Sequence, residues 1–461
     1  MKFQISHLWA PLNVSAALLL HRQSSDCCLI RVMQIPDVGQ ISAAASQRRL
    51  PWPKRVDVAL LSFFAMMIAL ADRINLSVAA PVLMKERGWD TVQMGWVLSG
   101  FFIGYSLMMV PMGILADRYG AKWVLAFSVA WWSLFTALTP WPRSLMAMTV
   151  VRIFMGMGES GMMPCINSIL VRWFPRHEYS RAATFSWSGG NAGAILAFPL
   201  ASAILSYWGW PSVFFVFACL GVLWLPFWIS GVTDDPSVSR GLSDSELTHI
   251  LSGLPSLRRI TRVPWKQILS LPAIFALMAL HFSFNWIAYV LASWLPAYLL
   301  VERHFSLSNM AIGSSLPFLS ILIGGNLFGM MIDRCTLRHD RTLIRKLFVI
   351  PLMMAGGTLL LVPAASSPAL LVVLLCLAAG LASGAYPVIT SGSLDIAPRY
   401  SGTVVGLQNC VANFSGILVP VVTGYVVKVS GWTAAFWLAA SVCALGFLAY
   451  SFFGQAKKLV D

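Results

Sequence analysis

The chain has 461 residues, of which 58% are hydrophobic and only 11% are charged, and its mean hydropathy is +0.74. A soluble protein of this length carries charged side chains at about a quarter of its positions. The composition therefore excludes an ordinary soluble domain and indicates a membrane protein with several spans.

The first 55 residues precede any stretch long enough to cross a bilayer. The apolar run NVSAALLL is too short to span and has polar neighbours. Met33 opens a hydrophilic stretch that leads to the basic flank QRRLPWPKR. We take Met33 as the candidate start, which makes residues 1–32 an extension, and we predict that residues 1–55 form a cytoplasmic segment.

Twelve apolar stretches of roughly 20 residues follow, each long enough to cross a membrane. Every one of them must be helical, because lipid offers no partner for free backbone N–H and C=O groups. The predicted spans are 57–82, 92–115, 121–139, 144–169, 181–206, 211–231, 272–300, 308–332, 344–362, 368–393, 402–427 and 432–454.

The basic residues lie mostly on one side of these spans. After residue 33, 22 Lys and Arg fall in the amino-terminal flank, the even-to-odd loops and the tail, whereas five fall on the opposite side. The positive-inside rule then places both termini in the cytoplasm. We read the net charge of +14 as a topology signal and expect no nucleic-acid partner.

The eight cysteines include no CxxC pair and no Cys/His cluster in the sequence. Most of them fall inside the spans, where cysteine is typical of small apolar packing residues. His177 and His339 fall in loops without a visible partner. We therefore expect no disulfide framework, no metal site and no cofactor.

An internal repeat divides the chain into two halves. GILADR at 113–118 recurs as GMMIDR at 329–334, and NAGAILAFPL at 191–200 is echoed by NFSGILVP at 413–420. The sequence predicts an all-α membrane protein with two six-helix bundles, a design typical of transporters with a site between the halves. The predicted domains are an N-terminal bundle (56–231), a cytoplasmic linker loop (232–271), a C-terminal bundle (272–454) and a cytoplasmic tail (455–461).

The loop GILADRYGAK at 113–122 resembles the signature between helices 2 and 3 of the major facilitator superfamily. The resemblance implies the major facilitator fold. In that family the loop Asp and Arg brace the cytoplasmic gate, which makes Asp117, Arg118, Asp333 and Arg334 gating candidates. The alternative is that these side chains only anchor the ends of loops.

Three further segments are similar to the anion:cation symporter branch of that superfamily. They are DRINLSVAAP at 72–81, RWFPRHE at 172–178 and NWIAYVLASWLPAYL at 285–299. The branch includes bacterial transporters of galactonate, glucarate and hexuronate, sialin and the vesicular glutamate transporters. The similarity covers about residues 56–454 and implies a multi-pass protein of a plasma membrane, the inner membrane in a bacterium.

Four charged side chains fall deep within the spans: the acids Asp72 and Glu159, and the bases Arg73 and Arg152. Ionised groups at that depth are costly and usually functional. Arg152 and Glu159 are two helical turns apart, about 10 Å, on one face. Asp72 and Arg73 point about 100° apart, so we expect Arg73 to face the central cavity and Asp72 the fourth span.

These residue types indicate an anion site coupled to protons. An Arg guanidinium is a permanently charged fork that suits a carboxylate, so Arg73 and Arg152 are substrate candidates. Asp72 and Glu159, each under opposing pulls from burial and arginine, are candidates for proton coupling. The resemblance implies the same roles for the matching positions. The alternative is a structural ion pair between the first and fourth spans.

Polar side chains elsewhere in the spans are weaker candidates for binding the substrate's hydroxyl groups. His281, Asn285 and Tyr289 are spaced by four and form one helical stripe. Such stripes can also bond neighbouring helices. The run SWSGGNAG at 186–193 favours close helix packing, and Gly190 stands where some sugar-acid members have Gln. The secondary substrate-binding candidates are Tyr105, Asn191, His281, Asn285, Tyr289, Asn409 and Asn413.

We predict a secondary active transporter that takes up a small organic anion, a sugar acid or related hydroxy acid, in symport with protons by alternating access. Its expected partners are that anion, protons and the lipid bilayer, and we expect a monomer. The alternatives are an anion exchanger or exporter, an uncoupled anion transporter, and a sensor that binds without transport. We find no nucleophile–base set and no nucleotide loop in the sequence, so we predict that the chain is not an enzyme.

Overall fold

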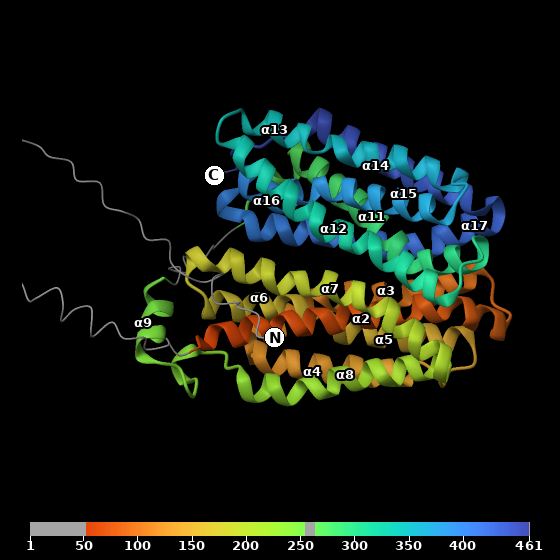
Figure 1. Cartoon of the computed structure of the whole chain (residues 1–461). Coiled ribbons are helices and arrows are strands. Elements are labelled where there is room, and N and C mark those ends of the chain that lie inside the picture. The colour runs from red at the N-terminus through yellow and green to blue at the C-terminus, as the bar shows by residue number, and fades with distance from the viewer. Residues whose placement is uncertain (1–51, 254–262, 461) are drawn as a thin grey trace, which may run out of the picture. The chain divides into compact units, whose positions relative to one another are not determined.

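The computed structural model describes residues 52–253 and 263–460 (Figure 1). The predicted extension 1–32 and nearly all of the segment 1–55 lie outside the described residues. Within the described ranges the chain is helical, without a β-strand. The all-α prediction is therefore confirmed for this part of the chain.

The helices follow one another in chain order, with short 3-10 and π-helical turns at some of their ends. The first-half helices are α2 (Lys54–Arg87), α3 (Thr91–Tyr119), α4 (Ala121–Leu138), α5 (Leu145–Glu159), α6 (Met162–Trp173), α7 (Arg176–Trp208) and α8 (Trp210–Gly231). The linker contains η2 (Pro236–Val238), α9 (Asp244–Ser252) and α10 (Trp265–Leu269). The second-half elements are α11 (Pro272–Ala297), η3 (Tyr298–Glu302), α12 (Leu307–Thr336), α13 (Arg341–Leu347), α14 (Ile350–Leu361), η4 (Val362–Ala364), α15 (Pro368–Ala382), η5 (Ser383–Ala385), α16 (Tyr386–Ile396), η6 (Pro398–Tyr400) and α17 (Ser401–Phe453).

These elements make twelve spans. By length and composition, nine described segments are apolar enough to cross a membrane. The tenth is α2, and the eleventh is α5 continued by α6 across a short break at Ser160 and Gly161. The last comes from α17, which is two helices joined at Gly431, where a φ of 77° interrupts the helical backbone. The prediction of twelve transmembrane helices in two six-helix bundles is confirmed.

The glycines of the run 186–193 let α7 pack directly on α2. A Cβ atom at Gly189 would lie 2.1 Å from the Phe63 carbonyl oxygen, and one at Gly193 would lie 2.2 Å from that of Met67. No side chain fits at such distances, so the helix backbones touch. The close-packing interpretation of this run is confirmed, and α2 is held in place beside the candidate site.

The linker, predicted as a loop, contains a helix of its own. Ser243 begins α9 by accepting a hydrogen bond from the Glu246 N–H, and acidic residues fill the first turn. The sequence SDSE carries this capping signal, which our reading of a polar loop missed. Glu246 in turn accepts hydrogen bonds from the backbone N–H groups of Lys54 and Arg55, so α9 is docked on the first turn of α2.

The helix contact at Gly193 can be tested by Gly193→Ala. The added methyl group has to push α2 and α7 apart, and we expect a loss of about 1–3 kcal/mol in the free energy of unfolding. Thermal unfolding of the purified protein in detergent measures it. The matched control is Gly325→Ala in α12, where a Cβ meets nothing within 4 Å. Equal midpoints for the two variants would contradict the packing described here.

Candidate functional site

The acids and bases of the membrane interior form one cluster between α2 and α5. Arg73 from α2 pairs with Glu159 at the end of α5, and both its Nε and Nη2 atoms approach the same carboxylate oxygen. Glu159 is fully buried, whereas 14% of the Arg73 side chain is exposed. Arg73 is therefore the less buried member of the pair, and its cavity-facing position stays a prediction.

Arg152 lies in the same cluster but has no carboxylate partner. It is 1% exposed, and within the described ranges no carboxylate oxygen lies within 4.0 Å of its guanidinium. Its Nη1 atom contacts the sulfur of Met155 at 2.9 Å, while its Nε atom and the Oε2 atom of Glu159 have no hydrogen-bond partner. Among the described residues, the cluster thus keeps one cation without a direct carboxylate contact, together with unpartnered hydrogen-bonding atoms.

One aromatic ring lies close to both guanidinium groups. The Cζ atoms of Arg73 and Arg152 lie 5.0 Å and 5.5 Å from the centre of the Phe101 ring, and Arg73 also lies 4.8 Å from the ring of Tyr105. These are cation–π distances. The structure brings the predicted Tyr105 into the site. We missed Phe101, although its spacing of four from Tyr105 places both rings on one face of α3.

Asp72 corrects one of our expectations. We expected its side chain to face the fourth span, but its Oδ2 atom accepts a hydrogen bond of 3.1 Å from the Trp132 indole of α4, the third span. Asn75, one turn further along α2, lies 3.5 Å from the other oxygen. The indole offers a neutral donor, so the fully buried Asp72 is satisfied in part without an arginine.

The second half contributes a polar stripe across from Phe102. The Tyr289 hydroxyl donates to the Asn413 side chain at 3.0 Å, and the Asn413 amide donates to the Asn409 carbonyl at 2.8 Å. The Tyr289 ring lies 4.7 Å from that of Phe102, the neighbour of Phe101. Three second-half candidates are therefore joined and reach the aromatic wall of the first-half cluster.

The remaining polar candidates are less well connected to the cluster. The Asn285 amide contacts the Ala412 carbonyl at 3.4 Å, and His281 lies 3.2 Å from Gln408, a side chain we did not single out. Both contacts join α11 to α17, which fits the helix-bonding alternative for this stripe. Asn191 is half-buried in α7, and its substrate role stays a prediction.

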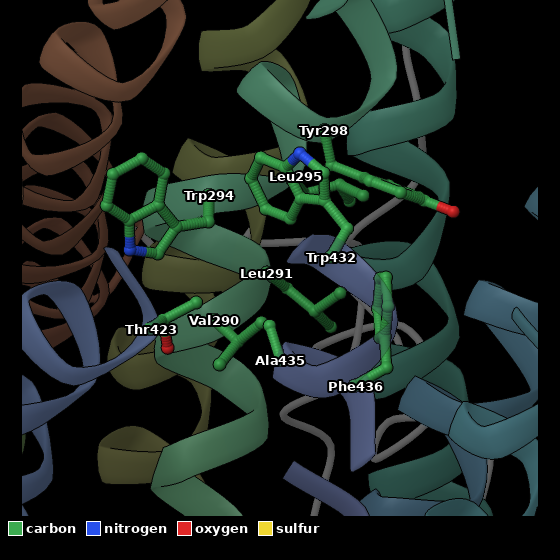
Figure 2. Close-up of a pocket in the computed structure, with 9 residues that line it drawn as sticks. All are labelled: Val290, Leu291, Trp294, Leu295, Tyr298, Thr423, Trp432, Ala435 and Phe436. Carbon is green, nitrogen blue, oxygen red and sulfur yellow. The ribbon is translucent and has the colours of Figure 1, made fainter. Parts of the chain in front are cut away.

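Figure 2 shows a small cavity lined by α11, η3 and α17, and none of its lining residues belongs to the charged cluster. Its volume is about 10 Å³, and its wall is mostly apolar, with Trp294, Tyr298 and Trp432 among its members. A single water molecule needs about that volume. The cavity therefore cannot hold an organic anion and is not the candidate site.

The four gating candidates are exposed in this structure. None of Asp117, Arg118, Asp333 and Arg334 forms an ion pair within 4.0 Å in the part of the chain that is described. The end of the segment 113–122 is held instead by Asp234, which accepts a hydrogen bond of 3.1 Å from the Lys122 N–H. The gating role of the four residues stays a prediction.

The two halves meet closely where the first turns of α3 contact the part of α17 that precedes Gly431. The Thr91 hydroxyl donates to the Gly424 carbonyl at 2.6 Å, and the Ser99 hydroxyl donates to that of Ile417 at 2.7 Å. Asp90 pairs with Lys428 at 2.8 Å. The hydrogen bond from Lys428 and one from the Gln93 N–H lower the pKa of Asp90 below its usual range.

Twelve spans in two bundles, with charges buried between the helices, are the architecture of a membrane transporter. The family model described as Major Facilitator Superfamily matches residues 62–418 and 340–459. The chain belongs to the Major Facilitator Superfamily.

Known relatives and solved structures agree with this assignment. The chain is 32% identical to "Sodium-dependent phosphate transport protein 1, chloroplastic" of Arabidopsis thaliana, over 91% of this chain and 84% of that protein. It is 29% identical to human "Sialin", over 87% and 90%. A bacterial homologue of the lysosomal transporter Spinster matches 87% of this chain and 98% of its own, with a TM-score of 0.73 and 17% identity. The resemblance to the anion:cation symporter branch is confirmed.

The buried pair predicts a measurable coupling between Arg73 and Glu159. Arg73→Ala leaves Glu159 as an uncompensated buried charge, and we expect the double variant with Glu159→Gln to recover part of the lost stability. A double-mutant cycle from thermal unfolding should give a coupling energy of about 0.5–3 kcal/mol. The exposed pair Asp90–Lys428 is the control, with a coupling near zero. Additive effects at Arg73 and Glu159 would show that they do not pair.

Proposed function

We propose that the chain carries a small organic anion, a sugar acid or related hydroxy acid, across the membrane in symport with protons by alternating access. The observation that carries this proposal is Arg152, a buried guanidinium that has no carboxylate within 4.0 Å and no partner for its Nε atom among the described residues. A buried guanidinium that no carboxylate contacts directly can bind an added anion at short range, where the low dielectric of the interior screens the attraction poorly.

The charge balance of the cluster explains why a proton accompanies the anion. With all four side chains ionised, the two acids and two bases sum to zero. A proton alone leaves a net positive charge in the interior and an anion alone leaves a net negative one, whereas both together restore neutrality. Burying a net charge is costly, so each ligand favours the binding of the other.

The second-half stripe supports a hydroxylated substrate. The Tyr289 hydroxyl and the Asn409 and Asn413 amides can donate to and accept from alcohol groups, and the first half offers guanidinium groups for a carboxylate. The rings of Phe101 and Tyr105 add flat apolar faces. A sugar acid combines these features in one molecule, with its carboxylate toward Arg73 and Arg152 and its hydroxyl groups toward α11 and α17.

Sodium is the alternative coupling ion, because the same charge balance holds for any monovalent cation. The name of the Arabidopsis relative, a sodium-dependent transporter of phosphate, supports this alternative. Exchange of one anion for another, or transport without coupling, is a further possibility within the same fold. Transport assays in sodium-free buffer distinguish them.

The basic residues support an orientation with both termini in the cytoplasm of a plasma membrane. With this orientation, the contacts of Asp90, Thr91 and Ser99 with α17 close the outer side. The exposed gating candidates Asp117 and Asp333 then mark the inner side. We propose that the structure is an inward-facing state of a monomeric transporter with bundles at 56–231 and 272–454.

Proton coupling can be measured in proteoliposomes loaded with a pH-sensitive dye in sodium-free buffer. We expect one of a panel of sugar acids to drive proton influx through the wild type. Glu159→Gln cannot accept a proton, so it should abolish that influx while keeping exchange of labelled anion. Full proton-coupled uptake by this variant would exclude Glu159 as the coupling site.

Asp90→Asn is the matched control, since it also neutralises an acid that is paired with a base. The pKa of Asp90 is lowered, so its carboxylate is fully ionised at and above the pH range in which carboxyl groups usually titrate. Its ion pair with Lys428 is lost only when the pH falls through the lowered pKa. Between pH 6 and pH 8 the pair therefore does not titrate. We expect Asp90→Asn to keep proton influx.

Substrate hydroxyl recognition can be tested with Tyr289→Phe, which keeps the ring against Phe102 and removes only the hydroxyl. Loss of one neutral hydrogen bond of about 1 kcal/mol should raise KM for the hydroxylated acid about fivefold. An acid of equal charge without hydroxyl groups serves as the comparison, and its KM should not change. Equal effects on both acids would place the Tyr289 hydroxyl outside the hydroxyl-binding part of the site.

A further inference from the structure

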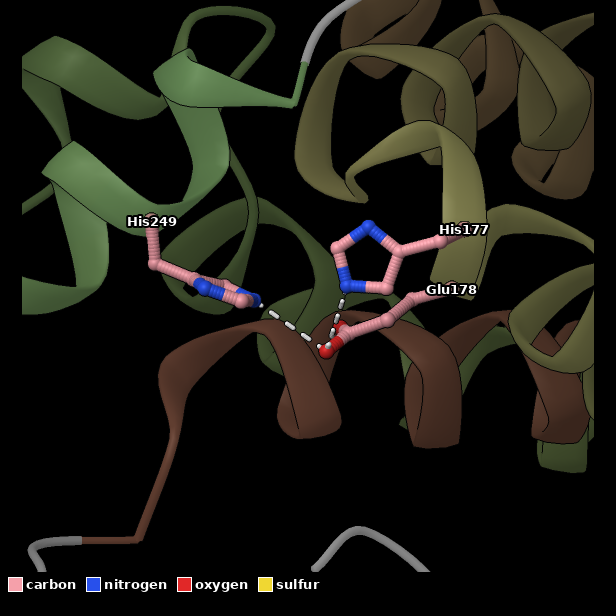
Figure 3. A group of neighbouring side chains, drawn as sticks. All are labelled: His177, Glu178 and His249. Carbon is pink, nitrogen blue, oxygen red and sulfur yellow. Dashed lines mark hydrogen bonds and ion pairs between the residues drawn. The ribbon is translucent and has the colours of Figure 1, made fainter. Parts of the chain in front are cut away.

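We propose that His177, Glu178 and His249 form a binding site for a divalent transition metal ion of the zinc class. The three side chains converge where the first turn of α7 meets the linker helix α9 (Figure 3). Their ligand atoms all lie within 4.8 Å of one another. This site is separate from the transport cluster and does not depend on the proposed function.

The distances suit tetrahedral coordination. The Glu178 Oε1 atom lies 3.1 Å from Nε2 of His249 and 3.8 Å from Nε2 of His177. Metal–ligand bonds of about 2.0–2.2 Å set at tetrahedral angles separate the ligand atoms by about 3.3–3.5 Å. His177 is largely exposed, so its ring is free to make the small rotation that closes the geometry. Two imidazoles and a carboxylate are a donor set that zinc prefers.

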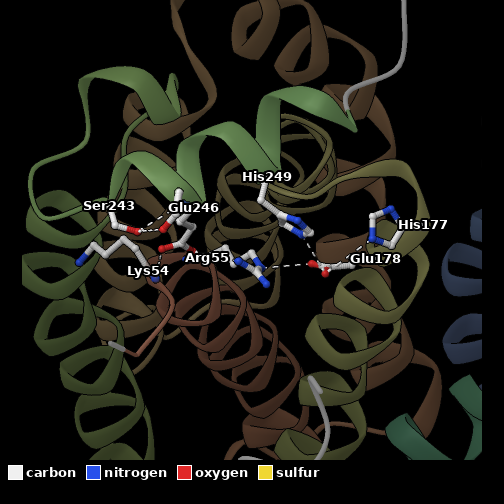
Figure 4. Close-up of polar contacts among 8 residues, drawn as sticks. Lys54, Arg55, His177, Glu178, Ser243, Glu246 and His249 are labelled. Atoms are coloured by element: carbon white, nitrogen blue, oxygen red, sulfur yellow. Dashed lines mark hydrogen bonds and ion pairs between the residues drawn. The ribbon is translucent and has the colours of Figure 1, made fainter. Parts of the chain in front are cut away.

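Arg55 positions the carboxylate for this role. Its Nε atom donates to the Oε2 atom of Glu178 at 3.1 Å, which leaves Oε1 directed at the histidines (Figure 4). A hydrogen bond to the second oxygen of a metal-binding carboxylate is a common means of orienting it. The Arg55 Nη1 atom also lies 3.3 Å from the Oε1 atom of Glu246. Two carboxylates therefore surround one guanidinium, and the net negative charge of these three groups favours a cation.

A metal ion here would join the linker to the first half. Glu178 belongs to α7 and His249 to α9, 71 positions apart in the chain. Our reading of the sequence expected no metal site and gave His177 no partner. The second expectation is corrected, because the docking of α9 on α2 brings the two histidines together, whereas the metal site itself is our proposal. The ring centres of His177 and His249 lie 5.8 Å apart.

Zinc binding can be measured by calorimetric titration of zinc chloride into the full-length protein in detergent, purified with a tag that contains no histidine. We expect one zinc ion per chain and a higher unfolding midpoint with zinc than with a chelator. His177→Ala and His249→Ala should each lower the affinity for zinc at least about tenfold. Removing a residue that only hydrogen-bonds to a metal ligand already has an effect of about that size. Cobalt absorption spectra report the ligand set independently.

His339→Ala is the matched control, since His339 is an exposed loop histidine outside the cluster and its removal should leave zinc binding unchanged. His177 is largely exposed, so the unfolding midpoint of His177→Ala in the presence of a chelator should equal that of the wild type. Absence of zinc binding by the wild type would overturn the proposal. So would undiminished binding by the double variant His177→Ala/His249→Ala.

Discussion

A charge buried in a membrane interior needs a counter-charge, and this requirement governs how α2, α3 and α5 are arranged. Glu159 meets it through Arg73, whereas Arg152 is left with the Phe101 ring and the Met155 sulfur. Neither contact replaces a carboxylate. The cluster is balanced in total charge but not pair by pair, and this imbalance is the basis of the proposed binding of an anion together with a proton.

Close helix packing fixes the cluster within the first half and also joins the two halves. Within the first half, α2 and α7 touch backbone to backbone at Gly189 and Gly193. A small motion of the two helices therefore cannot change which residues are in contact. Between the halves, the described polar contacts near α3 include two hydroxyl-to-carbonyl hydrogen bonds and one exposed ion pair. Each of these polar contacts is worth about 1 kcal/mol or less. The helices α3 and α17 also touch backbone to backbone, since a Cβ atom at Gly95 would lie 2.5 Å from the Pro420 carbonyl oxygen, so the halves are held here mainly by close packing.

The sequence predicted the spans well because bilayer thickness and backbone satisfaction leave few choices, and the four interior charges stood out against an apolar background. It could not predict which charges pair. The Arg73–Glu159 contact depends on the rotation of α2 relative to α5, and Asp72 turned to Trp132 because an indole donor happened to face it. The His177–His249 cluster was hidden for a similar reason, since helix α9 sets a contact that no local spacing encodes.

The pairing that the sequence could not predict also simplifies the proposed coupling. Arg73 is both the partner of Glu159 and the more accessible base of the cluster. In the proposed cycle, a substrate carboxylate that draws this guanidinium away leaves Glu159 without its counter-charge, and a proton then becomes the least costly replacement. Loss of that proton restores the ion pair and weakens the hold on the substrate. Because one guanidinium serves both ligands, coupling needs no pathway through distant parts of the protein.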